Sequence, residues 1–284
     1  MQSVRIKAHA KINLTLEIVG REQGFHMLDS LVASVDLHDL IVLKKRKDKQ
    51  CTVTMIGGGT DIPMKENGAW KAAKSFCGRF SVNGVDITVY KKIPIGAGLG
   101  GSSADVAGVL QGMAKLYEID DFDALCSLAE GLGSDTKYML HGGFARMQGR
   151  GEKITPLDIK EKLHLLLLCP FSAVHTGACY QKYDELPKTL EYRESQTEAC
   201  ICALQQEDVK EASRYLTNDL FVPAVHLNAD VESAYRQVRE LSPLGAVMTG
   251  SGSCVLATYA TISACRKAAR SYQGPFCVLV TETL

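Results

Sequence analysis

The sequence predicts an α+β fold with two domains, and three patterns carry that prediction. Apolar residues alternate with polar ones over residues 4–18, which is the period of a β-strand. After Ser102 the apolar spacing becomes that of a helix, so the glycine-rich run before it connects a strand to a helix. The second half combines a buried-strand pattern at 163–169 with helical patterns. We expect the two domains at 1–156 and 157–284.

The first half opens with strands. The alternating run predicts one long strand or a pair of strands, and its polar face carries Lys11 and Asn13, where exposure to solvent is the simplest interpretation. Further elements expected before the boundary are strands at 31–45, 85–95 and 144–148, helices at 66–80, 106–116 and 121–132, and a short helix before Gly142. Beyond a turn at Thr155 and Pro156 we expect the strand at 163–169, helices near 195–217, 229–241 and 262–272, a strand pair around a tight turn at 250–253, and a last strand at 276–280.

Composition narrows the class of protein. The 284 residues are 46% hydrophobic, and 32 basic residues balance 32 acidic ones, so no net field attracts nucleic acid or an anionic membrane. No apolar run approaches the length of a membrane span, and the first residues lack the apolar core of a signal peptide. Ten cysteines are scattered without a C-x-x-C pair, which fits a reducing compartment. We therefore expect a cytoplasmic protein that binds neither nucleic acid nor membrane.

The glycine-rich run predicts a phosphate-binding loop. Four glycines within six positions let backbone N–H groups approach an anion, and the following helix adds its positive end. Ser102 and Ser103 would cap that helix or turn their hydroxyls toward phosphate or a metal ion. A tight turn with a serine cap would explain one or two glycines but not four. The residues expected to bind the nucleotide here are Pro94, Gly96, Ala97, Gly98, Leu99, Gly100, Gly101, Ser102 and Ser103.

The same glycines also allow a competing interpretation. Gly96, Gly98 and Gly101 satisfy the dinucleotide fingerprint, so a nicotinamide- or flavin-dependent oxidoreductase is the alternative from another class. Against it, the preceding strand alternates and ends in Lys91, whereas a central parallel strand should be apolar on both faces. The loop also lacks the Gly-Lys-Ser/Thr of the common nucleoside-triphosphatases.

Four segments carry a resemblance to a known family. Residues 94–103 resemble the signature of the superfamily of galactokinase, homoserine kinase, mevalonate kinase and phosphomevalonate kinase. Within it, residues 10–39, 133–152 and 248–257 resemble the 4-diphosphocytidyl-2-C-methyl-D-erythritol kinase family. The resemblance implies a GHMP-kinase-like fold with a ferredoxin-like second domain, ATP and Mg²⁺ as cofactors, and transfer of the γ-phosphoryl to the 2-hydroxyl of 4-diphosphocytidyl-2-C-methyl-D-erythritol. Another superfamily kinase, acting on homoserine, mevalonate or a sugar, would not need a base pocket.

The resemblance also implies roles for particular residues. Lys11 and Asp135 would form the reaction centre beside Asn13, with Asp135 accepting the hydroxyl proton and Lys11 stabilising the developing charge. From position alone, Asp135 would be a helix cap after Ser134. The residues implied to bind the substrate are Asn13, Phe25, His26, Thr176, Tyr180, Gly250 and Ser251, and Asn67 is implied to lie near the adenine.

In this scheme Phe25 and Tyr180 face each other across the cytosine, while His26 bonds its edge. Phe25 stands where the family usually has tyrosine, so the stacking face remains but the hydroxyl is lost. Ser102, Ala104 and Lys137 also depart from the family pattern. The sequence assigns no metal ligand and no oligomeric state.

Overall fold

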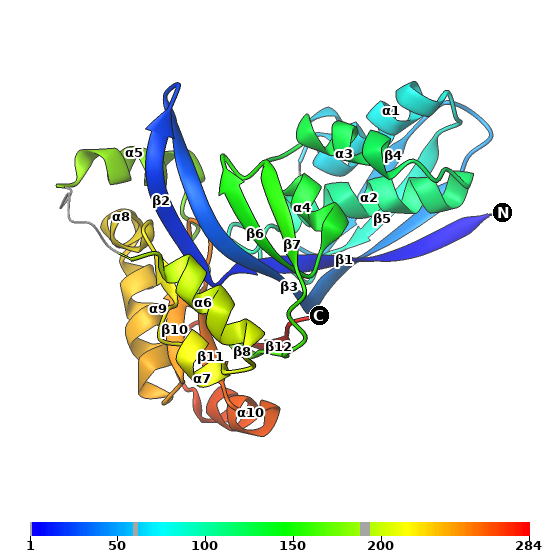
Figure 1. Ribbon diagram of the computed structural model, residues 1–284. Coiled ribbons are helices and arrows are strands. Elements are labelled where there is room, and N and C mark those ends of the chain that lie inside the picture. Colours follow the sequence, from blue (N-terminus) through cyan, green and yellow to red (C-terminus); the bar gives the residue numbers. More distant parts are fainter. Residues whose placement is uncertain (1, 59–61, 188–193) are drawn as a thin grey trace. The chain divides into compact units, whose positions relative to one another are not determined.

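The computed structural model describes residues 2–58, 62–187 and 194–284, and its fold is α+β, as predicted (Figure 1). The strands are β1 Ser3–Asn13, β2 Thr15–Glu22, β3 Phe25–Lys45, β4 Thr52–Ile56, β5 Val85–Tyr90, β6 Phe144–Gly149, β7 Lys153–Leu157, β8 His164–Cys169, β9 Thr217–Asn218, β10 Gly245–Met248, β11 Val255–Tyr259 and β12 Cys277–Glu282. The helices are α1 Gly68–Phe80, α2 Gly101–Tyr117, α3 Phe122–Glu130, α4 Thr136–His141, α5 Thr176–Glu185, α6 Gln196–Gln205, α7 Val209–Ala212, α8 Phe221–Leu227, α9 Ala229–Glu240 and α10 Ile262–Ser271, with a 3₁₀ turn at Met64–Glu66.

The chain forms two compact units, each built from separate stretches. The first unit contains residues 1–10, 37–94 and 100–142, and the second contains residues 11–36, 95–99 and 143–284. The turn expected at Thr155 and Pro156 is wrong, because strand β7 runs through both residues and pairs with β6. The division into domains at 1–156 and 157–284 stays a prediction.

The first unit packs helices against a small sheet. Strand β5 runs parallel to β4 and antiparallel to the last residues of β3. Helix α2, predicted after Ser102, packs beside α1, α3 and α4. Two glycines let α2 approach the sheet, since a Cβ on Gly108 would lie 2.7 Å from Cδ1 of Ile41 and one on Gly112 would lie 2.0 Å from Cδ1 of Leu43. Helix α2 is therefore held close to the sheet.

The second unit contains an antiparallel sheet with strand order β10-β11-β8-β12. Strand β8 is flanked by β11 and β12, and the leucines at 165–168 are buried, which explains why its sequence is apolar throughout. Helices α9 and α10 pack on this sheet (Figure 1). A second group of strands consists of the β6–β7 hairpin, the first half of β3, and β2.

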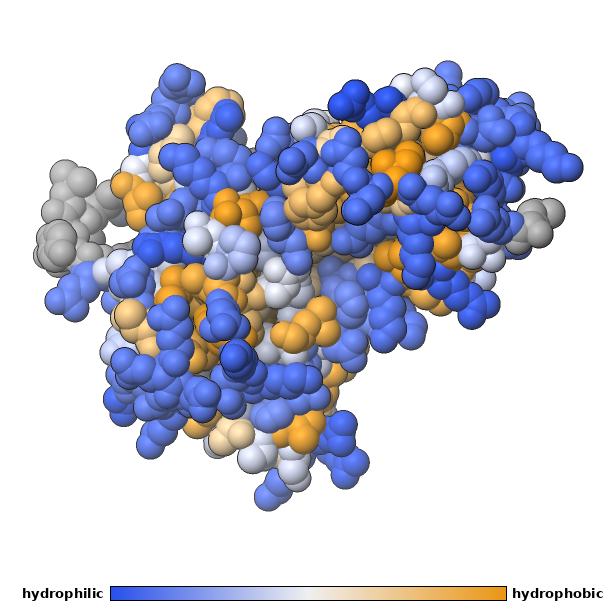
Figure 2. All heavy atoms as spheres, turned by 45° about the vertical axis from the view of Figure 1, so that its right-hand side comes forward, coloured by the Kyte–Doolittle hydropathy of each residue, from blue (hydrophilic) through white to orange (hydrophobic). Residues whose placement is uncertain are grey.

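The surface is mixed in character. Figure 2 shows hydrophilic residues over much of the visible face, with smaller hydrophobic areas among them. Among the residues described, no helix combines the length and apolar character needed to cross a bilayer.

Candidate active site

In the first unit, helix α2 begins with backbone groups suited to an anion. Its N-cap is Gly100, in a left-handed conformation with φ 69°, and no side chain caps the helix there. The first N–H groups of a helix have no partner within the helix. Gly101, Ser102 and Ser103 lie in this first turn, so an incoming phosphate would meet backbone donors and the positive end of a helix of 17 residues.

A buried ion cluster fixes the connection that leads to this helix. Lys91, just after β5, donates from Nζ to Asp39 on β3 and to Asp105 on α2, the latter at 2.7 Å. Asp39 Oδ1 also accepts from the backbone N–H groups of Lys92 at 2.5 Å and Ile93 at 2.9 Å. Sequence reasoning missed Asp39, since nothing in its local sequence marks it as the partner of the strand end.

The cluster changes the acidity of Asp105. Burial and the nearby Asp39 carboxylate raise the pKa of Asp105 to about 7, although the Lys91 ammonium opposes that shift. Its Oδ1 is buried and has no hydrogen-bond partner. Asp105 therefore links helix α2 to Lys91 at the end of β5 through a buried ion pair.

Asp135 lies in a turn that packs beside α2. It occupies the N-cap position of α4, but its side chain makes no capping hydrogen bond, so the simple interpretation as a helix cap fails. A Cβ on Gly133 would lie 2.8 Å from Oγ1 of Thr136 and 3.2 Å from Oγ of Ser103. The turn and the phosphate-side helix thus meet within the first unit, and Thr136 Oγ1 is buried there without a hydrogen-bond partner.

Asn67 caps the helix that starts next to α2. Its Oδ1 accepts from Ala69 N at 2.9 Å, and its side chain is buried. A Cβ on Gly68 would lie 3.7 Å from Oγ of Ser102 and closer still to Val106. The position implied for adenine binding is therefore beside the first turn of α2, although contact with adenine stays a prediction.

In the second unit, Lys11 and Asn13 are buried, so the simple interpretation of this strand face as exposed to solvent is wrong for both. Lys11 Nζ donates to Asn13 Oδ1 at 2.5 Å, and Asn13 Nδ2 donates to Ser30 Oγ at 2.8 Å. The Asn13 backbone N–H donates to Thr249 Oγ1 at 2.9 Å. These bonds fix the side chain of Asn13 and, through it, the ammonium group.

The tight turn between β10 and β11 packs against part of the glycine-rich loop. Cys254 N donates to Ala97 O at 3.2 Å, and Lys11 N donates to Leu99 O at 3.1 Å. Gly98 has φ +76°, and a Cβ there would lie 2.2 Å from the Thr249 carbonyl oxygen. Residues 95–99, the 249–254 turn and Lys11 therefore form one assembly inside the second unit.

The aromatic residues of the expected base pocket have other partners in the structure. The His26 ring stacks on Tyr180 with centroids 5.0 Å apart, and its Nε2 is 2.8 Å from Asp184 Oδ1. Arg150 lies over the Phe25 ring, with Cζ 4.7 Å from the centroid. The expected arrangement of Phe25 and Tyr180 across a base stays a prediction, and Arg150 and Asp184 are partners that sequence reasoning missed.

Phe25 also lines a pocket of about 380 Å³ in the second unit. The pocket lies between the β2–β3 and β6–β7 connections, with Leu28, Gln148 and Arg150 among its other walls. Thr176 Oγ1, at the start of α5, is 2.9 Å from Ser251 Oγ. Thr176 is therefore brought to the Gly250–Ser251 turn, and contact of these residues with a substrate stays a prediction.

The two predicted catalytic residues belong to different units. Lys11 lies in the second and Asp135 in the first. Their individual roles and their joint action stay predictions.

Comparison with known proteins identifies the class of protein to which the chain is similar. Residues 67–144, which contain α1, α2 and the Asp135 turn, match the family described as GHMP kinases N terminal domain. A solved structure titled "Crystal structure of 4-(cytidine 5'-diphospho)-2C-methyl-D-erythritol kinase" is similar over 99% of both chains, with a TM-score of 0.81 and 29% identity. A homoserine kinase from Cytophaga hutchinsonii, at 19% identity and a TM-score of 0.75, shares the fold, covering 100% of this chain and 95% of its own.

Full-length relatives narrow the class to one family. The 4-diphosphocytidyl-2-C-methyl-D-erythritol kinase of Caldicellulosiruptor saccharolyticus is 36% identical over 259 residues, which cover 90% of this chain and 88% of the relative. That of Clostridium tetani is 34% identical over 256 residues, covering 89% of each chain. The chain belongs to the 4-diphosphocytidyl-2-C-methyl-D-erythritol kinase family. This membership favours the kinase interpretation of the glycine-rich loop over the dinucleotide alternative.

Proposed function

We propose that the protein uses Mg-ATP to phosphorylate the 2-hydroxyl of 4-diphosphocytidyl-2-C-methyl-D-erythritol. Family membership supports the substrate, because relatives covering most of the chain carry that name. One observation in this chain carries the proposal furthest. The second unit joins the buried Lys11–Asn13 pair, the 95–99 part of the glycine-rich loop and the 249–254 turn through direct hydrogen bonds.

The nucleotide phosphates would bind to the first turn of α2. Backbone N–H groups at the glycine-rich loop fit phosphate oxygens, since no side chain caps the helix. The hydroxyl of Ser103, beside the unpartnered Thr136 Oγ1, would hold Mg²⁺ together with the phosphates. When bound, the ion would neutralise charge on the transferring phosphoryl group. Adenine would lie toward Asn67 at the start of α1.

The acceptor hydroxyl would be activated by Asp135. A tertiary alcohol is a weak nucleophile, so a positioned carboxylate that accepts its proton accelerates attack on the γ-phosphorus. The Lys11 ammonium, positioned by Asn13, would stabilise the charge that develops during transfer. Lys11 is only 6% exposed. Because a buried charge interacts more strongly than a charge in water, its ammonium would stabilise that developing charge more effectively than an exposed lysine would.

Recognition of the cytidyl group would depend on Phe25 and His26. The half-exposed Phe25 ring offers a stacking face at the 380 Å³ pocket. His26 Nε2 is engaged by Asp184, so a hydrogen bond from His26 to the base would use Nδ1. Thr176 and Ser251, whose hydroxyl groups are hydrogen-bonded to each other, would contact the same ligand.

A substrate panel tests the proposal. Purified protein is incubated with Mg-ATP and, separately, 4-diphosphocytidyl-2-C-methyl-D-erythritol, mevalonate, homoserine and galactose, and products are followed by phosphorus NMR. Selective phosphorylation of the cytidyl substrate is the expected result. Preferential turnover of another alcohol would refute the base pocket at Phe25 and His26, and turnover of none would refute the kinase proposal.

Changing Asp135 tests the proton acceptor. We expect Asp135→Asn to fold normally, since this side chain makes no capping bond, yet to lose about a hundredfold or more of kcat because general base catalysis is removed. Steady-state kinetics and thermal unfolding measure the two effects. Asp120→Asn, an exposed carboxylate in the same unit, is the matched control. Near-normal kcat in Asp135→Asn would remove Asp135 from the mechanism.

A further inference from the structure

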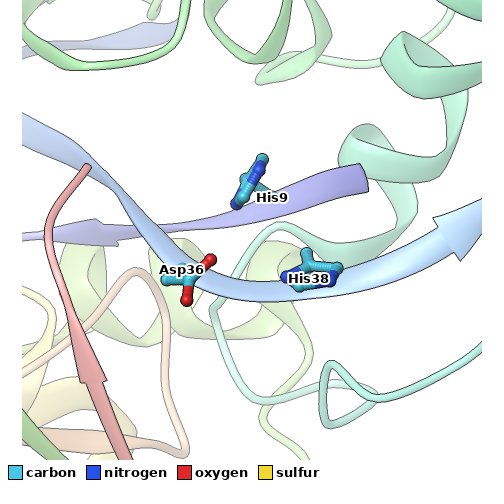
Figure 3. A group of neighbouring side chains, drawn as sticks. All are labelled: His9, Asp36 and His38. Carbon is cyan, nitrogen blue, oxygen red and sulfur yellow. The ribbon is translucent and has the colours of Figure 1, made fainter. Parts of the chain in front are cut away.

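Two histidines and an aspartate gather on adjoining strands outside the residues assigned to phosphoryl transfer. His9 lies on β1, Asp36 and His38 lie on β3, and these strands pair in one sheet (Figure 3). One ligand atom from each residue lies within 4.8 Å of the others. In the described parts of the chain, no other group of three or more histidines, cysteines or carboxylates meets that distance.

The arrangement follows from strand geometry. Side chains two residues apart on a strand leave the same face, so Asp36 and His38 project together from β3. The His9 and His38 rings have centroids 5.1 Å apart and planes inclined by 52°, so they are not stacked face to face. Inclined imidazoles can direct one nitrogen each toward a shared point. Both histidines are partly buried and Asp36 is exposed.

The ligand set points to a transition metal. Imidazole nitrogen suits zinc, nickel, cobalt and copper, whereas Mg²⁺ prefers oxygen ligands throughout. Two histidines and one carboxylate supply three protein ligands, and such a site leaves further coordination positions to water. We propose that His9, Asp36 and His38 form a binding site for a divalent transition metal ion of the Zn²⁺ class, separate from the Mg²⁺ that accompanies ATP.

Binding of Co²⁺ to the tag-free chain tests this proposal. Co²⁺ is chosen because thiolate ligands add an intense near-ultraviolet charge-transfer band that nitrogen and oxygen ligands do not give. This matters in a chain with ten cysteines. The protein is stripped with a chelator, dialysed against Co²⁺, and analysed for bound metal and visible absorption. We expect a single bound ion per chain with a spectrum of nitrogen and oxygen ligation.

Variants locate the ion. His9→Gln and His38→Gln should each weaken Co²⁺ binding by about tenfold or more, because loss of a ligand costs at least as much as loss of a supporting contact. His226→Gln, which removes a histidine from α8, should bind as the unaltered chain does. If a histidine variant fails to fold, Asp36→Asn replaces it, because this substitution changes the shape of the side chain least and should also weaken Co²⁺ binding. Absence of stoichiometric Co²⁺ in the unaltered chain, a thiolate spectrum, or equal binding by the folded cluster variants would overturn the proposal.

Discussion

At the scale of single residues, Asp105 shows how burial changes a side chain that sequence alone leaves ambiguous. In the first turns of a helix, a carboxylate is favoured by the dipole but would oppose a bound phosphate. In the structure, the Asp105 carboxylate accepts a hydrogen bond from Lys91 Nζ, which also donates to Asp39. Burial raises the pKa of Asp105 to about 7; the neighbouring Asp39 carboxylate adds to this shift, and the Lys91 ammonium opposes it.

The raised pKa has a consequence for stability. An acid whose pKa rises from 3.8 to about 7 on folding binds more protons in the folded chain, so its contribution to stability is full at low pH and is lost as pH rises toward 7. We expect the unfolding free energy of the unaltered chain, relative to Asp105→Asn, to fall by roughly 2 to 3 kcal/mol between pH 5 and pH 8, because each pKa unit corresponds to about 1.4 kcal/mol. Urea unfolding of both chains at several pH values measures this difference. A difference that is flat or rises over this range would refute the assignment.

At the scale of elements, Asn67 has a structural role that can be separated from its proposed contact with adenine. Its Oδ1 caps α1, so Asn67→Ala should lower the unfolding free energy by about 1 kcal/mol, whereas Asn67→Asp keeps the capping oxygen and should change it little. If Asn67 contacts adenine, both variants should raise KM for ATP. If KM for ATP is unchanged in Asn67→Asp, the role of Asn67 is limited to capping α1.

Gly98 tests the packing of the glycine-rich loop against the 249–254 turn. Gly98→Ala combines a positive φ with a Cβ 2.2 Å from a carbonyl oxygen of Thr249, which cannot move as a side chain can. Gly143→Ala is the matched control, because Gly143 has a similar φ of +69° but nothing within 4 Å of an added Cβ. We expect about 1 kcal/mol of destabilisation in the control from backbone strain and distinctly more in Gly98→Ala. Thermal unfolding measures both, and equal losses would show that the loop does not pack as described.

At the scale of the whole molecule, nucleotide binding should be visible as stabilisation. A ligand at about 100 times its Kd that binds only the folded chain adds about 2.7 kcal/mol. For a chain of this size, a non-hydrolysable ATP analogue with Mg²⁺ should therefore raise Tm by about 5 °C. NADH is the control, because the dinucleotide alternative predicts that it would stabilise the protein instead. A shift with NADH and none with the ATP analogue would contradict the kinase proposal.

The sequence by itself located several of the elements. Periodicity located α2, β8 and the β10–β11 turn because local spacing of apolar residues and glycines carries that information. It left open whether residues 4–18 form one strand or two, and the structure has β1 and β2. It misplaced a turn at Thr155 because proline is tolerated within a strand when its missing N–H is not needed.

Only the tertiary structure decided which side chains meet. The burial of Lys11 and Asn13 depends on Ser30 and Thr249, residues that are distant along the chain, so an alternating pattern read locally implied solvent. The same holds for Asp39 with Lys91 and for His9 with His38, whose proximity comes from strand pairing. Local sequence fixes backbone preference, while contacts between distant residues arise when the folded chain buries its apolar surface and must give every enclosed polar group a partner.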